Sequence, residues 1–423
     1  MKKEHIYLGA MASCYGGVFL SYGPIYLCHI LLLLSFAMWL ISRKGTSSLF
    51  VKKSTTLYLF PLIFLVWYGI SALWAIDPKA SLKYMYYVIM GVTICFSIVE
   101  YATTPSKLNR LLQFTGVIVG LEMIVSGLER FQLFRWPISP YSPLSAHFGR
   151  EYKIESAYSA EIVEHLQTIP TGFHWNPNNT AIAILISIPF FLFSKSWILK
   201  VLGTVMGIFV IFSGNSRTAL LALALLFVCG VFYLKPKVRN MTIIGGIVLI
   251  GIISTVSYVQ KNSIYHQVNY AAASLEAMFS EEHRNISSIS VRRNLAENSK
   301  NALFDSWGAG VGGGNAKVIQ NNMGLLDQKT VSQHNFWLEI LVEGGLFIFL
   351  AFIGWMAYLI FKLAVIYKTS RSEIKWIAGA CSLALVGFSF GCISLSSAIF
   401  FMPMWMLFGV SVATINLFQK ENE

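Results

Sequence analysis

Charged residues are scarce in this sequence: only 12% of its 423 residues are Asp, Glu, Lys or Arg, whereas 55% are hydrophobic. The mean hydropathy is +0.61. A water-soluble domain of this composition would expose more apolar surface than water tolerates. Apolar runs of about 17–25 residues recur along the chain, which is the length that a helix needs to cross the hydrocarbon. The sequence therefore predicts an all-α, polytopic membrane protein.

Several chemical patterns are also missing. No Cys-x-x-Cys pair and no Asp-x-Asp pair occurs, so the sequence offers no familiar metal-binding motif and we expect no cofactor. The first apolar run lacks a small-residue cleavage site, so no cleavable signal peptide is expected. The six cysteines all fall in apolar runs, which excludes a disulfide framework in the loops and predicts buried free thiols: Cys14, Cys28, Cys95, Cys229, Cys381 and Cys392.

The apolar runs divide the chain into five parts. Residues 1–128 are expected to hold five spans, residues 180–259 four and residues 346–423 three, with long outer loops at 129–179 and 260–345. The twelve predicted spans are Ile6–Tyr22, Ile25–Ser42, Leu57–Ala75, Leu82–Tyr101, Leu111–Leu128, Thr180–Phe193, Trp197–Ser213, Thr218–Leu234, Met241–Val259, Leu346–Tyr367, Trp376–Ser394 and Ala398–Phe418.

The net charge of +12 would suit a nucleic-acid partner, but its distribution favours another explanation. If the N-terminus is cytoplasmic, sixteen Lys and Arg residues lie on the inner side, and the short outer loops hold only Lys79 and Arg217. This is the positive-inside bias of inner-membrane proteins. We therefore expect both termini in the cytoplasm and no nucleic-acid partner.

Among the polar residues inside predicted spans, Glu122 and His29 stand out. Glu122 lies within Leu111–Leu128, and an acid in the membrane is costly enough to suggest a function. A proton or substrate role and a hydrogen bond to a neighbouring helix are equally good interpretations. For His29 we expect packing against other helices rather than a functional role.

The first long outer loop ends in Thr-Gly-Phe-His-Trp-Asn-Pro-Asn-Asn, residues 171–179. Asn-Pro favours a turn, and Asn178 or Asn179 could cap a helix starting at Thr180. Besides this capping role, the segment offers hydrogen-bonding groups and an aromatic face of the kind that binds sugars: His174, Trp175 and Asn176.

Arg217 lies in Ser-Gly-Asn-Ser-Arg-Thr, at the outer end of a tight joint between two spans. It could extend toward lipid headgroups. The guanidinium is also well matched to phosphate, because its planar fork donates two parallel hydrogen bonds.

The second long outer loop, residues 260–333, is too long for a structureless connection and is therefore expected to be functional. Tyr265–Glu281 has amphipathic helical spacing, and Ser290–Ser299 is expected to start another helix. The glycine-rich stretch Gly308–Asn315 lacks the preceding strand and following Lys-Ser/Thr of a nucleotide loop. Its glycines are expected to adopt positive φ and to let the backbone approach a ligand closely.

The segment from His334 to Gly345 opens the apolar run Leu346–Tyr367, so His334 is expected at a membrane boundary. The structural alternative is that His334 caps a helix or packs at an interface. Gly344 and Gly345 should loosen the helix where it enters the bilayer. Glu339 and Glu343 are four residues apart, and we expect Glu343 to lie on a solvated face.

Taken together and in this order, these motifs resemble the O-antigen ligase/polymerase superfamily of bacterial envelope glycosyltransferases. The resemblance rests on the 171–179 segment, Ser-Arg-Thr at an outer joint, an Arg-containing loop helix with a glycine-rich stretch, and His-Asn before a Gly pair. It covers essentially the whole chain.

The resemblance implies that the glycan is carried on undecaprenyl pyrophosphate at the outer face of the inner membrane. It also implies that the glycan is transferred to an acceptor hydroxyl without metal. Arg217 and one of Arg292 or Arg293, with Arg284 as a further possibility, would bind the pyrophosphate, and His334 would be the general base. Glycan contacts would come from His174, Trp175, Asn176, Asn178 and Asn335.

Within the superfamily, the motifs favour a polymerase that extends lipid-linked repeat units, and a ligase that transfers the finished chain to lipid A–core is the alternative. An arginine-to-glycine spacing found in some polymerases is absent here. The expected partners are lipid-linked glycans, membrane lipids and a chain-length regulator. A flippase for lipid-linked sugars is a third possibility, but no internal repeat supports it.

Overall fold

The computed structural model describes residues 2–23, 25–42, 55–154, 159–233, 288–322, 335–395 and 397–421. Over these ranges the chain is largely helical, as predicted. Five helices are long and apolar enough to cross a membrane. They are α4 (Pro78–Tyr101), α5 (Pro105–Arg130), α14 (Phe336–Thr369), α15 (Ile374–Gly391, continued by the 3-10 helix η3, Cys392–Ser394) and α16 (Met402–Glu421).

Five shorter helices are also apolar, and each corresponds to a predicted span. They are α2 (Leu27–Ser42), α3 (Thr55–Ser71), α7 (Pro177–Leu192), α8 (Trp197–Ser213) and α9 (Arg217–Val231). The predicted span Met241–Val259 lies outside the described residues. The protein is therefore a multi-pass helical membrane protein, while the number twelve remains a prediction.

The first predicted span, Ile6–Tyr22, is not a continuous helix. Helix α1 (Lys2–Ser13) gives way to the 3-10 helix η1 (Cys14–Gly16), and Gly17 then adopts a φ of 54°. A side chain on Gly17 would lie 2.6 Å from Nδ1 of His174. The chain then forms a small antiparallel hairpin of β1 (Ser21–Tyr22) and β2 (Ile25–Tyr26). The apolar pattern therefore did not reveal the break at Gly17.

Several helix starts follow from a capping residue and a proline. Asp77, Thr104 and Asn176 each precede a proline, and each side chain accepts a hydrogen bond from a backbone N–H of the first turn. The capping oxygen satisfies a donor that the helix leaves open, and proline at the first helical position has no N–H to satisfy. The cap of α7 is therefore Asn176, not the predicted Asn178 or Asn179, and the helix begins three residues before Thr180.

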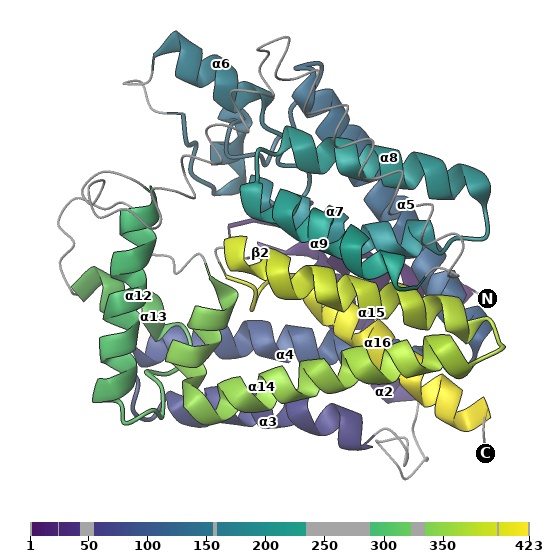
Figure 1. The fold of residues 1–423 in the computed structure, drawn as a ribbon. Helices are drawn as coiled ribbons and strands as arrows, with labels where there is room; N and C mark the ends of the chain where they lie inside the picture. Colours follow the sequence, from purple (N-terminus) through teal and green to yellow (C-terminus); the bar gives the residue numbers. More distant parts are fainter. Residues whose placement is uncertain are drawn as a thin grey trace.

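The helices pack lengthwise, and the two chain ends lie at the same end of the bundle (Figure 1). Helix α15 contacts α7, α9, α14 and α16, while α16 packs against α4. The contact between α16 and α4 requires glycine at residue 91, because the Trp405 ring occupies the space that a side chain there would fill. The buried apolar residues form one large cluster across these helices.

The other end of the bundle carries the described outer segments. Along the chain, the 3-10 helix η2 (Pro143–Phe148) and helix α6 (Ala160–Thr168) follow α5 and precede α7. Helices α12 (Ser288–Asp305) and α13 (Asn315–Asn322) lie beside the start of α14, away from both termini (Figure 1). Helix α12 confirms the helix predicted to start near Ser290. The predicted Tyr265–Glu281 helix falls outside the described residues.

Candidate functional site

The glycine-rich stretch joins α12 and α13 to the start of α14. Gly308, Gly310, Gly312 and Gly314 all have positive φ, as predicted. The backbone N–H groups of Val311 and Gly312 donate to the carbonyls of Val342 and Glu343, at 2.8 and 3.1 Å. In the described structure these glycines therefore bring the backbone close to α14. The sequence analysis had expected the backbone to approach a ligand instead.

Gly345 is the counterpart of this stretch on α14. Its φ of 78° and ψ of 174° interrupt the helix, which confirms the predicted loosening at the glycine pair. The N–H of Leu346 donates to the carbonyl of Gly308 at 2.9 Å. A side chain on Gly310 would lie 2.5 Å from the nitrogen of Gly345. Only glycine therefore allows the two backbones to cross at this point.

Glu339 and Glu343, just before this crossing, are both buried. The expectation that Glu343 lies on a solvated face is wrong, since its residue exposure is 1%. The Tyr68 hydroxyl donates to the Glu343 carboxylate at 3.3 Å, and Ser397 donates to Glu339. The folded glycine-rich stretch and α3 cover this face, which helical spacing alone could not reveal.

In the first outer region, Glu129 is the central anchor. Its carboxylate accepts hydrogen bonds from the backbone N–H groups of Thr171, Gly172 and Trp136, at 2.7, 2.9 and 3.1 Å. Arg135 lies 3.4 Å from the same carboxylate and also donates to two backbone carbonyls. Burial lowers the pKa of the Arg135 guanidinium, and the Glu129 charge opposes that shift. Glu129 thus ties both ends of the outer loop to α5.

Glu122, two turns earlier on α5, pairs with His174. Its Oε1 lies 3.3 Å from Nε2 of His174, and both side chains are almost completely buried. Gly172, with a φ of 48°, approaches Glu122 so closely that a side chain there would lie 3.0 Å from Oε1. Neither carboxylate oxygen of Glu122 accepts a hydrogen bond within the described residues, so both interpretations of Glu122 stay open. His29 is likewise buried, and its Nδ1 lies 3.1 Å from the Tyr86 hydroxyl, as expected for a packing histidine.

The predicted glycan residues occupy different positions. His174 points into the protein toward Glu122, whereas Trp175, Asn176 and Asn178 are half-buried. Trp175 has a φ of 65°, a left-handed conformation that costs a non-glycine residue about 1–3 kcal/mol and is often found at functional sites. Asn335 caps α14, where its Oδ1 accepts from the N–H groups of Trp337 and Leu338.

The predicted pyrophosphate residues are placed in part. Arg217 is exposed and is the first residue of α9, after the capping Ser216. Arg292 and Arg293 lie on α12, but their side chains are outside the described structure, as are Arg284 and His334. Asn335, which follows His334, lies at the same end of the bundle as the start of α9. The joint before α9 contacts the start of α7, because a side chain on Gly214 would lie 3.8 Å from the carbonyl of Pro177.

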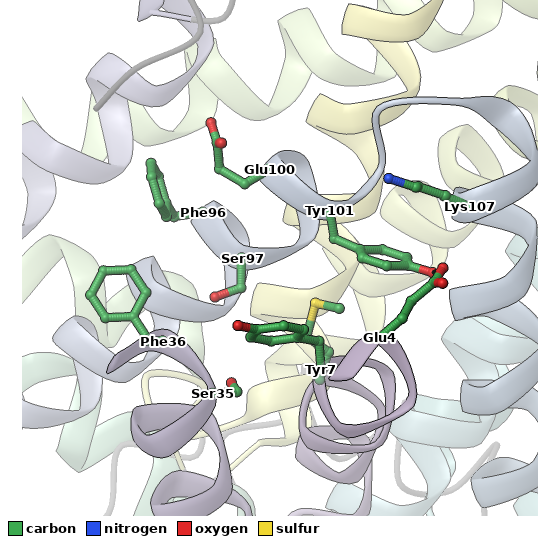
Figure 2. Close-up of a pocket in the computed structure, with 10 residues that line it drawn as sticks. Glu4, Tyr7, Ser35, Phe36, Phe96, Ser97, Glu100, Tyr101 and Lys107 are labelled. Atoms are coloured by element: carbon green, nitrogen blue, oxygen red, sulfur yellow. Dashed lines mark hydrogen bonds between the residues drawn. The ribbon is translucent and has the colours of Figure 1, made fainter. Parts of the chain in front are cut away.

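A cavity of about 330 Å³ lies at the opposite end, among α1, α2 and α4 (Figure 2). Tyr7, Phe36 and Phe96 line it, and the Tyr101 hydroxyl donates to Glu4 at 2.9 Å at its edge. Glu4 and Tyr101 lie at the end of the bundle that carries the termini. None of the predicted site residues lines this cavity.

Comparison with known proteins supports the resemblance found in the sequence. Residues 202–353 match the family model described as O-antigen ligase. The chain is also 26% identical over 378 residues to the teichuronic acid biosynthesis protein TuaE of Bacillus subtilis, covering 86% of this chain and 72% of the relative. The predicted resemblance to the O-antigen ligase/polymerase superfamily is confirmed.

The matched segment contains Arg217, Arg292, Arg293 and His334, which are some of the residues on which the resemblance rests. It does not include the first outer region with Glu129 and Trp175. The sequence analysis did not single out Glu129, since an acid at the end of an apolar run resembles an ordinary boundary residue. Its position seven residues after Glu122, on the same face of α5, was the available signal.

Proposed function

We propose that this protein is a metal-independent glycosyltransferase that polymerises oligosaccharide repeat units linked to undecaprenyl pyrophosphate. The resemblance to the superfamily supports a membrane enzyme that acts on lipid-linked glycans. The observation that carries the proposal is that the start of α9, helix α12 and the start of α14 all lie at the end opposite the termini (Figure 1). Arg217, Arg292 or Arg293, and His334 then belong to one side of the membrane.

The proposed reaction is an in-line displacement at the anomeric carbon of the donor glycan. His334 takes the proton of the acceptor hydroxyl, and the hydroxyl oxygen forms the new bond to the anomeric carbon. The bond from that carbon to the pyrophosphate oxygen breaks, and its electron pair leaves with the lipid pyrophosphate. Arg217 and an arginine from Arg284, Arg292 or Arg293 stabilise the negative charge that develops there. The anomeric configuration is inverted.

Histidine suits the role of base because its unperturbed pKa of about 6.5 lies close to neutral pH. General-base catalysis typically contributes about 10²–10⁴-fold to the rate. The leaving group is already good, so the reaction needs charge stabilisation and proton removal, and neither requires a metal ion.

We place the active site on the periplasmic face of the inner membrane, with both termini in the cytoplasm. The distribution of basic residues in the sequence supports this orientation. The common location of both chain ends, opposite the outer segments, agrees with it (Figure 1).

The alternative is a ligase that transfers the lipid-linked polysaccharide to lipid A–core, and the description of the matching family model favours it. The two activities use the same donor chemistry and differ in the acceptor. The name of the Bacillus relative refers to teichuronic acid biosynthesis, which supports a role in making an envelope glycopolymer without deciding between them.

The test uses the purified full-length protein in lipid nanodiscs with an undecaprenyl-pyrophosphate-linked repeat unit and EDTA. Analysis of the products with each acceptor separates the two activities: longer lipid-linked chains indicate a polymerase, and transfer to lipid A–core indicates a ligase. We expect His334→Ala to reduce the rate by about 10²–10⁴-fold.

His147→Ala is the matched control, because His147 is exposed in η2 of the first outer region. It should retain the wild-type rate. A full rate for His334→Ala would exclude the proposed base, and loss of activity in EDTA that returns with a divalent cation would exclude the metal-independent reaction.

A further inference from the structure

Arg150 and Trp175 form a contact between a cation and an aromatic ring in the first outer region. The guanidinium carbon of Arg150 lies 5.0 Å from the Trp175 ring centroid and 5.6 Å from that of Tyr26. Tyr26 belongs to the β1–β2 hairpin, and Trp175 precedes α7. Arg150 therefore connects two segments that are far apart in the sequence.

The guanidinium is fixed in place by neutral groups. Its Nε and Nη2 donate to the Ser21 hydroxyl at 3.2 and 3.0 Å, and Nη2 also donates to the Gly23 carbonyl at 3.0 Å. Gly149 and Gly23, both with positive φ, bring the two backbones together, and the Gly23 N–H donates to the Phe148 carbonyl at 2.8 Å. The arginine thus has a defined orientation before any ligand arrives.

Arg150 lacks a counter-ion among the described residues, unlike Arg135 of the same region. Arg135 pairs with Glu129, whereas no described carboxylate lies within ion-pair distance of Arg150. None of the hydrogen bonds of Arg150 within the described structure uses its Nη1. A half-buried guanidinium that is oriented but not neutralised is suited to receiving an anion, because charge-assisted hydrogen bonds are stronger than neutral ones.

The neighbouring groups indicate what carries that anion. Trp175 is half-buried, and Tyr22, whose ring lies beside Gly149, is 64% exposed. Aromatic rings provide an apolar surface with a polar edge, which suits the face of a sugar ring. The Glu122–His174 pair and the Glu129 contacts hold the segment before Trp175, and Trp175 itself has a φ of 65°.

We propose that Arg150 and Trp175 form a subsite for an oxyanion, a carboxylate or phosphate substituent, on the glycan that this enzyme handles. The subsite selects an acidic substrate and takes no part in bond breaking. The proposal rests on the proposed function for the origin of the glycan, but binding can be measured without turnover.

The experiment measures equilibrium binding to the full-length protein in nanodiscs by calorimetry. The probes are a hyaluronan tetrasaccharide, which carries carboxylates, and the neutral chitotetraose. Inorganic phosphate is added as a competitor to distinguish a phosphate source from a sugar carboxylate. The wild type should bind the acidic tetrasaccharide at least tenfold more tightly than the neutral one, or should bind phosphate measurably.

Arg150→Gln should abolish both the tenfold preference and any phosphate binding. Arg130→Gln, at the exposed end of α5, should change neither. Trp175→Leu keeps the polar contacts of Arg150 and should weaken the binding of both tetrasaccharides by a similar factor. This variant keeps the proposal testable even if Arg150→Gln does not fold. An unchanged preference in Arg150→Gln, or a wild type that binds neither anion, would overturn the proposal.

These outcomes are independent of the proposed function. If His334→Ala polymerises normally while Arg150→Gln loses acidic binding, the proposed base fails and the subsite stands. If His334→Ala is inactive while Arg150→Gln binds and transfers acidic substrates normally, the subsite fails alone.

Discussion

The two outer regions are both held by pairs of buried acids on spanning helices, but they use these acids differently. In the first region, Glu122 and Glu129 of α5 contact His174, Arg135 and backbone N–H groups. In the second, Glu339 and Glu343 of α14 contact the hydroxyls of Ser397 and Tyr68. The first pair therefore faces the Arg135 guanidinium and the His174 imidazole, whereas the second accepts hydrogen bonds from hydroxyls.

This difference indicates which contacts stabilise each region. The first region depends on carboxylates that organise an irregular segment, since Glu129 alone binds three backbone N–H groups. The second region depends on backbone crossing at glycines, where Val311, Gly312 and Leu346 donate to carbonyls. Substitution of acids should therefore damage the first region more, and substitution of glycines should damage the second.

The largest expected effect is in the first region. Glu129→Gln should destabilise the protein by about 3–5 kcal/mol, because it leaves Arg135 without its charge partner in a buried site and replaces an acceptor oxygen with an NH₂ group. Glu343→Gln should cost less than about 1 kcal/mol, because the Tyr68 hydroxyl can donate to an amide oxygen as well. Thermal unfolding in nanodiscs measures both. Equal losses would remove the distinction between the two acid pairs.

The next effect belongs to the glycine-rich stretch. Gly310→Ala should cost about 2–4 kcal/mol, since it adds the strain of a positive φ to an overpacked contact with Gly345. Gly308→Ala is the matched control: its φ is also positive, at 78°, but no neighbouring atom lies within 4 Å of the added carbon. It should cost only about 1 kcal/mol. If the two variants have the same melting temperature, the backbone crossing does not determine the stability of this region.

Part of this organisation was predictable from the sequence. The apolar runs predicted the five helices that are long enough to cross a membrane and five shorter apolar helices, because length and hydropathy reflect the bilayer directly. The glycines with positive φ and the break at Gly345 were also predictable, because few other residues adopt that conformation. Burial of Glu343 was not, since it depends on segments that approach α14 from more than 20 residues before it and from α3.

For the candidate site, the order of Arg217, the arginines of α12 and His334 led to the resemblance. The starts of α9 and α14 and helix α12 lie at one end of the bundle (Figure 1). The partners of Trp175 were not predictable, because Arg150 is positioned by a hairpin at the junction of two predicted spans. Local patterns thus identified the resemblance, and tertiary contacts identified the possible subsite.

The smallest effects concern the two capping asparagines, one in each region. Asn176→Ala and Asn335→Ala should each cost about 1 kcal/mol, the usual value of an N-cap. Aspartate caps as well as asparagine, so Asn176→Asp and Asn335→Asp should recover the melting temperature. Transfer activity then decides whether each residue does more than cap.

Aspartate keeps the acceptor oxygen that caps the helix but loses the amide donors and adds a negative charge. If Asn335 also contacts the glycan, Asn335→Asp will be stable but will show a raised KM, whereas a pure cap will recover activity together with stability. The same comparison at Asn176 tests the first region. Recovery at both positions would limit the asparagines to positioning Trp175 and His334. Recovery at only one would show which region binds the glycan through its cap.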